Sequence, residues 1–247
     1  MKYEFKATAR KFLPLYVALV LVSAFFRITD MGNFDLGKTV SSLVLSGLFI
    51  ALGILTFTVL VDRFNKNLLG DEGYLMFTLP VKTHHLITSK LIVSFIWSML
   101  SGIIAFIAAL VISGELHILK ELFFEIPEFF QALGRYIAEG YLVEIICAPI
   151  LLISIYAMSV LIIYLALAAA QLPIFIKHRG IISFVMFFVE IVVIEIITEG
   201  VYKLITSMNL VLSKNSTCVL TTIWFVVFAG VLFWLVNYIL NKHLNLE

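Results

Sequence analysis

The sequence predicts an all-α integral membrane protein with six transmembrane helices. Of its 247 residues, 62% are hydrophobic and only 13% are charged, and the mean hydropathy is +1.09. Because a soluble domain is about half apolar and a quarter charged, water would not solvate this surface. Crossing a bilayer takes about 20 apolar residues per helix, and six runs reach or approach that length: residues 12–28, 40–61, 86–113, 141–170, 181–198 and 218–240. We therefore expect a single transmembrane domain over residues 1–247.

Residues 1–11 predict an amphipathic helix on the membrane surface, ahead of the first span. Lys2, Lys6 and Arg10 recur every fourth residue, while Phe12 continues a separate apolar side of the same helix. Basic side chains on one side can reach lipid headgroups while the apolar side enters the acyl boundary. The alternative is a simple topological anchor. No small-residue cleavage site follows, so we expect this segment to be retained.

The distribution of positive charge predicts that both termini are cytoplasmic. Short cytoplasmic loops of membrane proteins are enriched in Lys and Arg. With the N-terminus inside, eleven of the 17 Lys and Arg residues fall on the cytoplasmic side and six on the outer side. Arg27 and Lys38, in the first outer connection, reduce this contrast. We expect a multi-pass protein of the plasma membrane.

Residues 114–140 predict short extracytoplasmic helices. The segment is too charged to cross a membrane and too apolar for a free loop. Pro127 separates two apolar stripes of helical spacing: Leu119, Leu122, Phe123 and Ile126, and then Phe129, Phe130, Leu133 and Ile137. Two interpretations stay open, an outer vestibule that meets amphipathic cargo and an interfacial belt that seals the rim.

The connection after the first span matches the sequence motif of a phosphate-binding loop. Gly32–Thr39 reads Gly-Asn-Phe-Asp-Leu-Gly-Lys-Thr, which fits G-x-x-x-x-G-K-[ST]. That chemistry needs a preceding buried strand and an acidic metal ligand on a neighbouring strand. Here two membrane spans flank the motif and the expected topology places it outside. We interpret the match as a coincidence.

Acidic residues within or near the spans are the remaining polar candidates. Because an ionised side chain is costly in a membrane, it usually faces a cavity or a partner, so Glu144, Glu190 and Glu195 are candidates for a substrate path. Glu195, Glu199 and Lys203 recur every fourth residue, so a ladder of salt bridges is the alternative there. Glu190 has no basic residue one turn away. No motif for a metal site or a catalytic site occurs.

The connection between the second and third spans, residues 62–85, carries the most specific pattern. Asp71 and Glu72 favour the start of a helix, and Pro80 ends it. Its apolar side chains would be unfavourable in water but would suit a pocket on a soluble partner: Tyr74, Met76, Phe77 and Leu79. Lys82 adds a charge that can steer association. The alternative is a hairpin packed on the membrane surface.

This connection and the six-span layout resemble the permease subunits of type-2 ATP-binding-cassette (ABC-2) transporters, especially small bacterial ones. The resemblance is most specific over Glu72 to Pro80, which reads Glu-Gly-Tyr-Leu-x-Phe-Thr-Leu-Pro. It implies that the connection holds a cytoplasmic coupling helix docked on a separate nucleotide-binding subunit, contacted by Glu72, Tyr74, Phe77, Leu79 and Pro80.

The resemblance also implies the composition of the whole transporter. A dimer of identical or related permease chains would form the pathway, and two ATPase subunits would bind ATP and Mg, so that this chain is not an enzyme and binds no cofactor. Similar members export amphipathic or antimicrobial peptides, phenol-soluble modulins among them. A secondary transporter and a non-transporting membrane assembly protein remain the alternatives. The inverted repeats of many secondary transporters would make the two halves similar, and residues 1–120 show no convincing similarity to residues 121–247.

Overall fold

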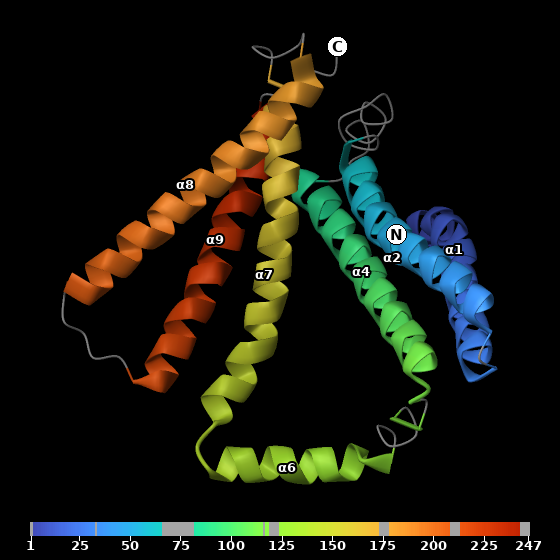
Figure 1. The fold of residues 1–247 in the computed structure, drawn as a ribbon. Coiled ribbons are helices and arrows are strands. Elements are labelled where there is room, and N and C mark those ends of the chain that lie inside the picture. Colours follow the sequence, from blue (N-terminus) through green and yellow to red (C-terminus); the bar gives the residue numbers. More distant parts are fainter. Residues whose placement is uncertain are drawn as a thin grey trace. The chain divides into compact units, whose positions relative to one another are not determined.

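The described parts of the chain are mostly α-helical. The structure is a computed structural model, and it describes residues 2–32, 34–65, 82–115, 117–118, 124–172, 178–207 and 213–242. Its labelled helices (Figure 1) are α1 (Lys2–Met31), α2 (Asp35–Phe64), α4 (Thr83–Ser113), α6 (Ile126–Ala138), α7 (Leu142–Ala169), α8 (Arg179–Ser207) and α9 (Lys214–Lys242). These ranges contain no strand. The predicted all-α class is confirmed.

Six of these helices are long and apolar enough to cross a membrane: α1, α2, α4, α7, α8 and α9. They coincide with the six predicted hydrophobic runs, but several extend past them. The fifth run ends at residue 198, whereas α8 continues to Ser207. Lys203 Nζ lies 2.7 Å from Glu199 Oε1 on this extension. Such an i,i+4 pair favours the helix after the apolar residues end.

The first helix does not separate the N-terminal segment from the first span. α1 is continuous from Lys2 to Met31, with Pro14 inside it. From Thr8 onward one side of the helix is buried, with Thr8, Phe12 and Leu19 almost inaccessible to solvent. The N-terminal segment is therefore helical, as predicted, but runs directly into the span. Its location on the membrane surface stays a prediction.

The helices fall into two compact units that interleave along the chain. The first contains Met1–Leu60 and Ile92–Gly134, and the second contains Val61–Leu91 and Arg135–Glu247. As a result, α2 and α4 each contribute most of their length to the first unit and one end to the second. This division does not test the predicted single transmembrane domain.

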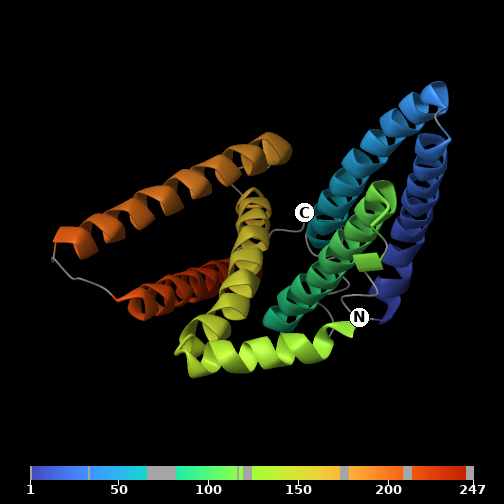
Figure 2. The same cartoon turned by 60° about the horizontal axis from the view of Figure 1, so that its bottom comes forward.

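The first unit is a three-helix core of α1, α2 and α4, which lie side by side in both views (Figures 1 and 2). The Phe12 ring stacks on Trp97 with centroids 4.8 Å apart and planes 6° from parallel. The Tyr16 and Ser101 hydroxyl oxygens lie 2.8 Å apart, and Thr56 donates a hydrogen bond to Ser101. Hydroxyl groups inside the bilayer are thus satisfied by one another, which ties the three helices together.

A glycine ends α4 in the same unit. Gly114 has φ +79°, and the Glu115 N–H donates to the Leu110 carbonyl at 3.1 Å. This pattern is a Schellman motif, whose left-handed residue is usually glycine. The Arg27 guanidinium lies so close to Gly114 that a Cβ atom there would clash with it. The positive φ favours glycine at this position, and a larger residue would also displace the Arg27 side chain.

The second unit is built on α7, which packs against both α8 and α9. α8 diverges from α7 and α9 toward Ser207 (Figures 1 and 2). No residue of α8 is buried, although the helix is apolar along most of its length. Its surface is therefore available to lipid or to another membrane chain.

Candidate functional site

The predicted coupling residues lie mostly outside the described part of the chain. Only Lys82 is described; it is exposed, and its carbonyl accepts a hydrogen bond from the His85 N–H at 3.0 Å. The other predicted residues are outside the described residues: Asp71, Glu72, Tyr74, Met76, Phe77, Leu79 and Pro80. The structure does define both ends of the connection, where α2 ends at Phe64 and α4 begins at Thr83.

The entry to this connection is held by an aromatic pair. Phe64, the last residue of α2, stacks on Tyr164 of α7 with ring centroids 4.0 Å apart and planes 12° from parallel. Both side chains are fully buried. A stacked aromatic pair contributes about 0.5–1.5 kcal/mol beyond the burial of its area. The end of α2 is therefore fixed to α7.

The exit from the connection is held by α9. The Thr83 hydroxyl, in the first turn of α4, donates to the Asn241 side-chain oxygen at 2.5 Å. Ile87, one turn further, is fully buried, and so is Val236 of α9. These residues all belong to the second unit. The last residue before the connection therefore contacts α7, and the first turn after it contacts α9.

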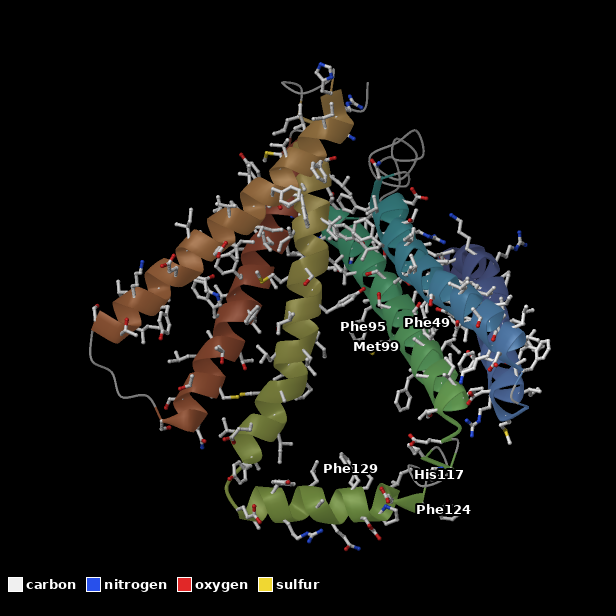
Figure 3. The ribbon with its side chains drawn as sticks, viewed as in Figure 1. Phe49, Phe95, Met99, His117, Phe124 and Phe129 are labelled. Atoms are coloured by element: carbon white, nitrogen blue, oxygen red, sulfur yellow. The ribbon has the colours of Figure 1, made fainter. Side chains whose placement is uncertain are left out.

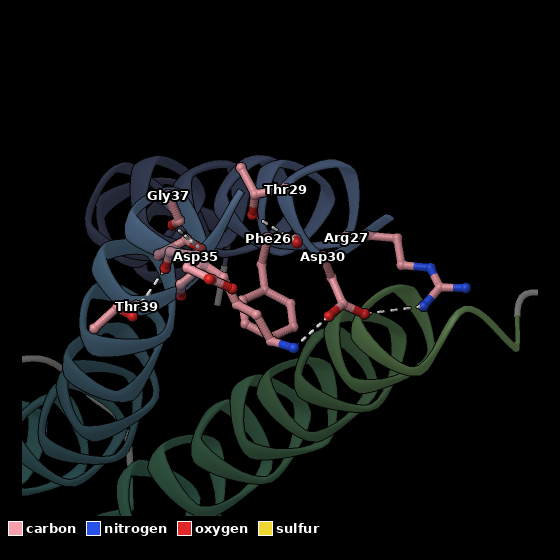
Figure 4. Close-up of polar contacts among 9 residues, drawn as sticks. Phe26, Arg27, Thr29, Asp30, Asp35, Gly37 and Thr39 are labelled. Carbon is pink, nitrogen blue, oxygen red and sulfur yellow. Dashed lines mark hydrogen bonds and ion pairs between the residues drawn. The ribbon is translucent and has the colours of Figure 1, made fainter. Parts of the chain in front are cut away.

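The motif with the letters of a phosphate-binding loop forms a different structure (Figure 4). Lys38 Nζ lies 2.5 Å from one Asp30 carboxylate oxygen, and Arg27 lies 3.6 Å from the other. The Thr39 hydroxyl donates to the Asp35 carbonyl at 2.9 Å. The lysine and hydroxyl that would hold phosphate and magnesium are therefore engaged within the helical turn between α1 and α2. This geometry agrees with the interpretation of the match as a coincidence.

The three acidic candidates differ in their surroundings. Glu190 of α8 has both carboxylate oxygens shielded from solvent, and neither has a hydrogen-bond partner among the described residues. Glu144, in the first turn of α7, has one such oxygen. Glu195 is exposed, and of the ladder expected there the structure shows the pair of Glu199 and Lys203. Glu190 is the most enclosed carboxylate of the three.

The acidic candidates do not form one cluster. Glu190 lies near the middle of α8, about 16 Å along the axis from Arg179 at 1.5 Å per residue. Glu144 lies at the opposite end of α7 from the connection to α8. Among the described residues, no group of three or more His, Cys, Asp or Glu side chains is arranged to hold a metal ion. Any role in a substrate path therefore belongs to these residues individually.

The sequence did not reveal a groove between α2 and α4 in the first unit. Its volume is about 450 Å³, and small residues create the space while Thr56 and Ser101 supply hydroxyl groups. Phe49, labelled in Figure 3, is one of its apolar walls; the small residues are Gly53, Gly102 and Ala105. The available signal was glycine inside two hydrophobic runs, because a glycine leaves the helix surface without a side chain; a Cβ added at Gly53 or Gly102 would meet no atom within 4 Å.

Comparison with known proteins identifies the family. A family described as ABC-2 family transporter protein matches residues 2–170, more than half of the chain. The match covers α1, α2, α4, α6 and α7, and with them the connection held by Phe64 and Thr83. No curated protein and no solved structure gives a significant match. With its six apolar helices, the chain is a multi-pass membrane protein that belongs to the ABC-2 transporter family.

Proposed function

We propose that the chain is the permease subunit of an ATP-driven exporter, and that residues 66–81 couple it to a separate ATPase subunit. The attachment of both ends of this segment to α7 and α9 is the observation that carries the proposal. A short docked helix can transmit the motion of a partner as a rigid body. Movement of the ATPase would therefore tilt α7 and α9 by way of Phe64 and Thr83.

Coupling to a cytoplasmic ATPase also sets the orientation. Two spans precede residues 66–81, so the N-terminus lies on the same side of the membrane as that segment. Six spans place the C-terminus there too. Both termini are then cytoplasmic, in agreement with the distribution of Lys and Arg. ATP and Mg bind to the ATPase, and this chain needs no cofactor.

The permease works as a dimer, of identical or related chains. Six spans of one chain enclose little space, and α8 offers a long apolar surface with no buried residue. Glu190, with both oxygens shielded and no hydrogen-bond partner among the described residues, lies midway along that helix. An acidic residue at such a depth usually faces a partner or a substrate path. We assign the cargo to amphipathic compounds, including antimicrobial peptides, whose cationic groups would pair with Glu190 when it ionises.

A purification experiment tests whether the chain is a permease. The tagged chain is co-expressed with the candidate ATPase subunits of its source cell and then purified. We expect one ATPase to copurify, native mass spectrometry to give two permease and two ATPase chains, and the reconstituted complex to export an amphipathic peptide only with ATP. Export driven by an ion gradient without an ATPase would identify a secondary transporter instead. A stable chain with no ATPase and no transport would identify an assembly protein.

A further inference from the structure

Helix α6 has one continuous apolar side on which no residue is buried. At 3.6 residues per turn, its apolar side chains occupy an arc of about 120°: Ile126, Phe129, Phe130, Leu133, Tyr136 and Ile137. None of its residues is buried, and Phe130 is 64% exposed. Figure 3 shows Phe129 on one side of α6, with most nitrogen- and oxygen-bearing side chains on the other. Pro127 occupies the first turn of α6, where it is tolerated, so α6 begins before the predicted break.

A tight turn attaches α6 to the following span. Gly140 has φ +94°, its N–H donates to the Ile137 carbonyl at 3.1 Å, and the Tyr141 N–H donates to the Tyr136 carbonyl at 3.0 Å. These bonds form a Schellman motif, which stops α6 and redirects the chain. The Tyr136 and Tyr141 rings meet edge to face, with centroids 5.9 Å apart, across the same turn. The end of α6 therefore has a defined position relative to α7.

The length of α7 places this turn at the membrane surface. Its 28 residues span about 42 Å, which exceeds the roughly 30 Å of the hydrocarbon layer. The first residues of α7 therefore reach the headgroup region, and α6 ends only at Ala138, next to that turn. Tyrosine is enriched at this depth, which suits Tyr136 and Tyr141. The apolar arc of α6, attached to α7 at the depth of the headgroups, can therefore reach the acyl chains.

We propose that α6 lies in the lipid surface on the side opposite residues 66–81, with its apolar arc inserted between the acyl chains. The polar side carries Glu128 and Arg135, and Glu139 follows directly after α6, so there is no excess of positive charge. Binding to the lipid therefore comes from burial of apolar area and not from attraction to anionic headgroups. The helix anchors the first turn of α7 at a fixed depth. This proposal does not depend on the identity of the ATPase or the cargo.

Site-directed fluorescence in nanodiscs tests the position of α6. Cys147 and Cys218 are replaced by serine, and bimane is attached to the full chain through Phe130→Cys on the apolar arc or Gln131→Cys on the polar side. We expect Phe130→Cys to give blue-shifted emission and severalfold stronger quenching by lipids with a spin label near the headgroup. Gln131→Cys is expected to respond mainly to a water-soluble quencher. The difference in quenching between the two positions should persist in nanodiscs that contain only zwitterionic lipid.

Three results would overturn the proposal. Equal quenching from water at both positions would place α6 clear of the membrane. Protection of Phe130→Cys from both lipid and aqueous quenchers would mean that protein covers the arc. Loss of the difference between the two positions in zwitterionic lipid would mean that attraction to anionic headgroups drives the binding of α6 to the membrane. Leu133→Cys repeats the measurement on the same arc, should Phe130→Cys prevent folding.

Discussion

Replacing Phe64 with alanine is expected to remove most of the increase in ATP hydrolysis that cargo causes in the reconstituted complex. The ring is fully buried and stacked on Tyr164 at the point where α2 enters residues 66–81. Without it, motion of that segment no longer reaches α7 directly. We expect at least about a tenfold fall, since a loss of ~1.4 kcal/mol in coupling already corresponds to a factor of ten. Steady-state ATPase rates with and without cargo measure the effect.

Phe12→Ala is the matched control for this prediction. Phe12 is also fully buried and stacked on a ring, that of Trp97, but it lies in the core of the first unit. Loss of a buried phenylalanine costs about 3–5 kcal/mol of stability in protein cores, so both variants should melt earlier. When ATPase rates are corrected for the amount of folded complex, only Phe64→Ala should lose the increase in rate that cargo causes. Equal stimulation in both variants would show that the aromatic pair does not transmit the motion.

Glu190→Gln is expected to lower export of cationic amphipathic peptides about tenfold or more, which matches the ~1.5–3 kcal/mol of a hydrogen bond to a charged group. The substitution keeps the size of the side chain and removes its capacity for charge. Transport of labelled peptides into inverted vesicles, with equal amounts of folded complex, measures the change. A neutral amphipathic cargo should be affected less.

Glu195→Gln, on the same helix, provides the comparison. Glu195 is exposed, whereas both oxygens of Glu190 are shielded from solvent. We expect Glu195→Gln to transport like the unmodified chain. If Glu190→Gln leaves the export of every tested substrate intact, Glu190 has no place in the substrate path, and its carboxylate serves assembly or packing instead.

The spans were predictable because a bilayer imposes a simple requirement on them. Each run of apolar residues became a helix, and the fourth, predicted over residues 141–170, matches Leu142–Ala169 closely. The helix ends were less predictable. Backbone hydrogen bonds and side-chain pairs continue a helix into polar sequence, as Glu199 and Lys203 do in α8. Apolar content alone therefore underestimates helix length.

The contacts that hold the two ends of the connection between α2 and α4 were not predictable from the sequence. Phe64 and Tyr164 lie far apart along the chain, as do Thr83 and Asn241, so no local spacing relates them. Tyr16 and Ser101, which tie α1 to α4, present the same difficulty. Each is an ordinary residue within an apolar run until the fold brings its partner near. Residues 66–81 are a candidate for coupling because their aromatic side chains would be unfavourable in water, and that role stays a prediction.

Photocrosslinking from Phe77 tests most directly whether residues 66–81 dock on an ATPase. The photoreactive amino acid p-benzoylphenylalanine replaces Phe77 in the complex, and in a parallel sample it replaces Phe34, which is 57% exposed just before the other end of α2. We expect illumination to link the permease to the ATPase from position 77 and not from position 34. A complex that exports cargo but gives no crosslink from position 77, or an equal one from position 34, would contradict the proposed coupling.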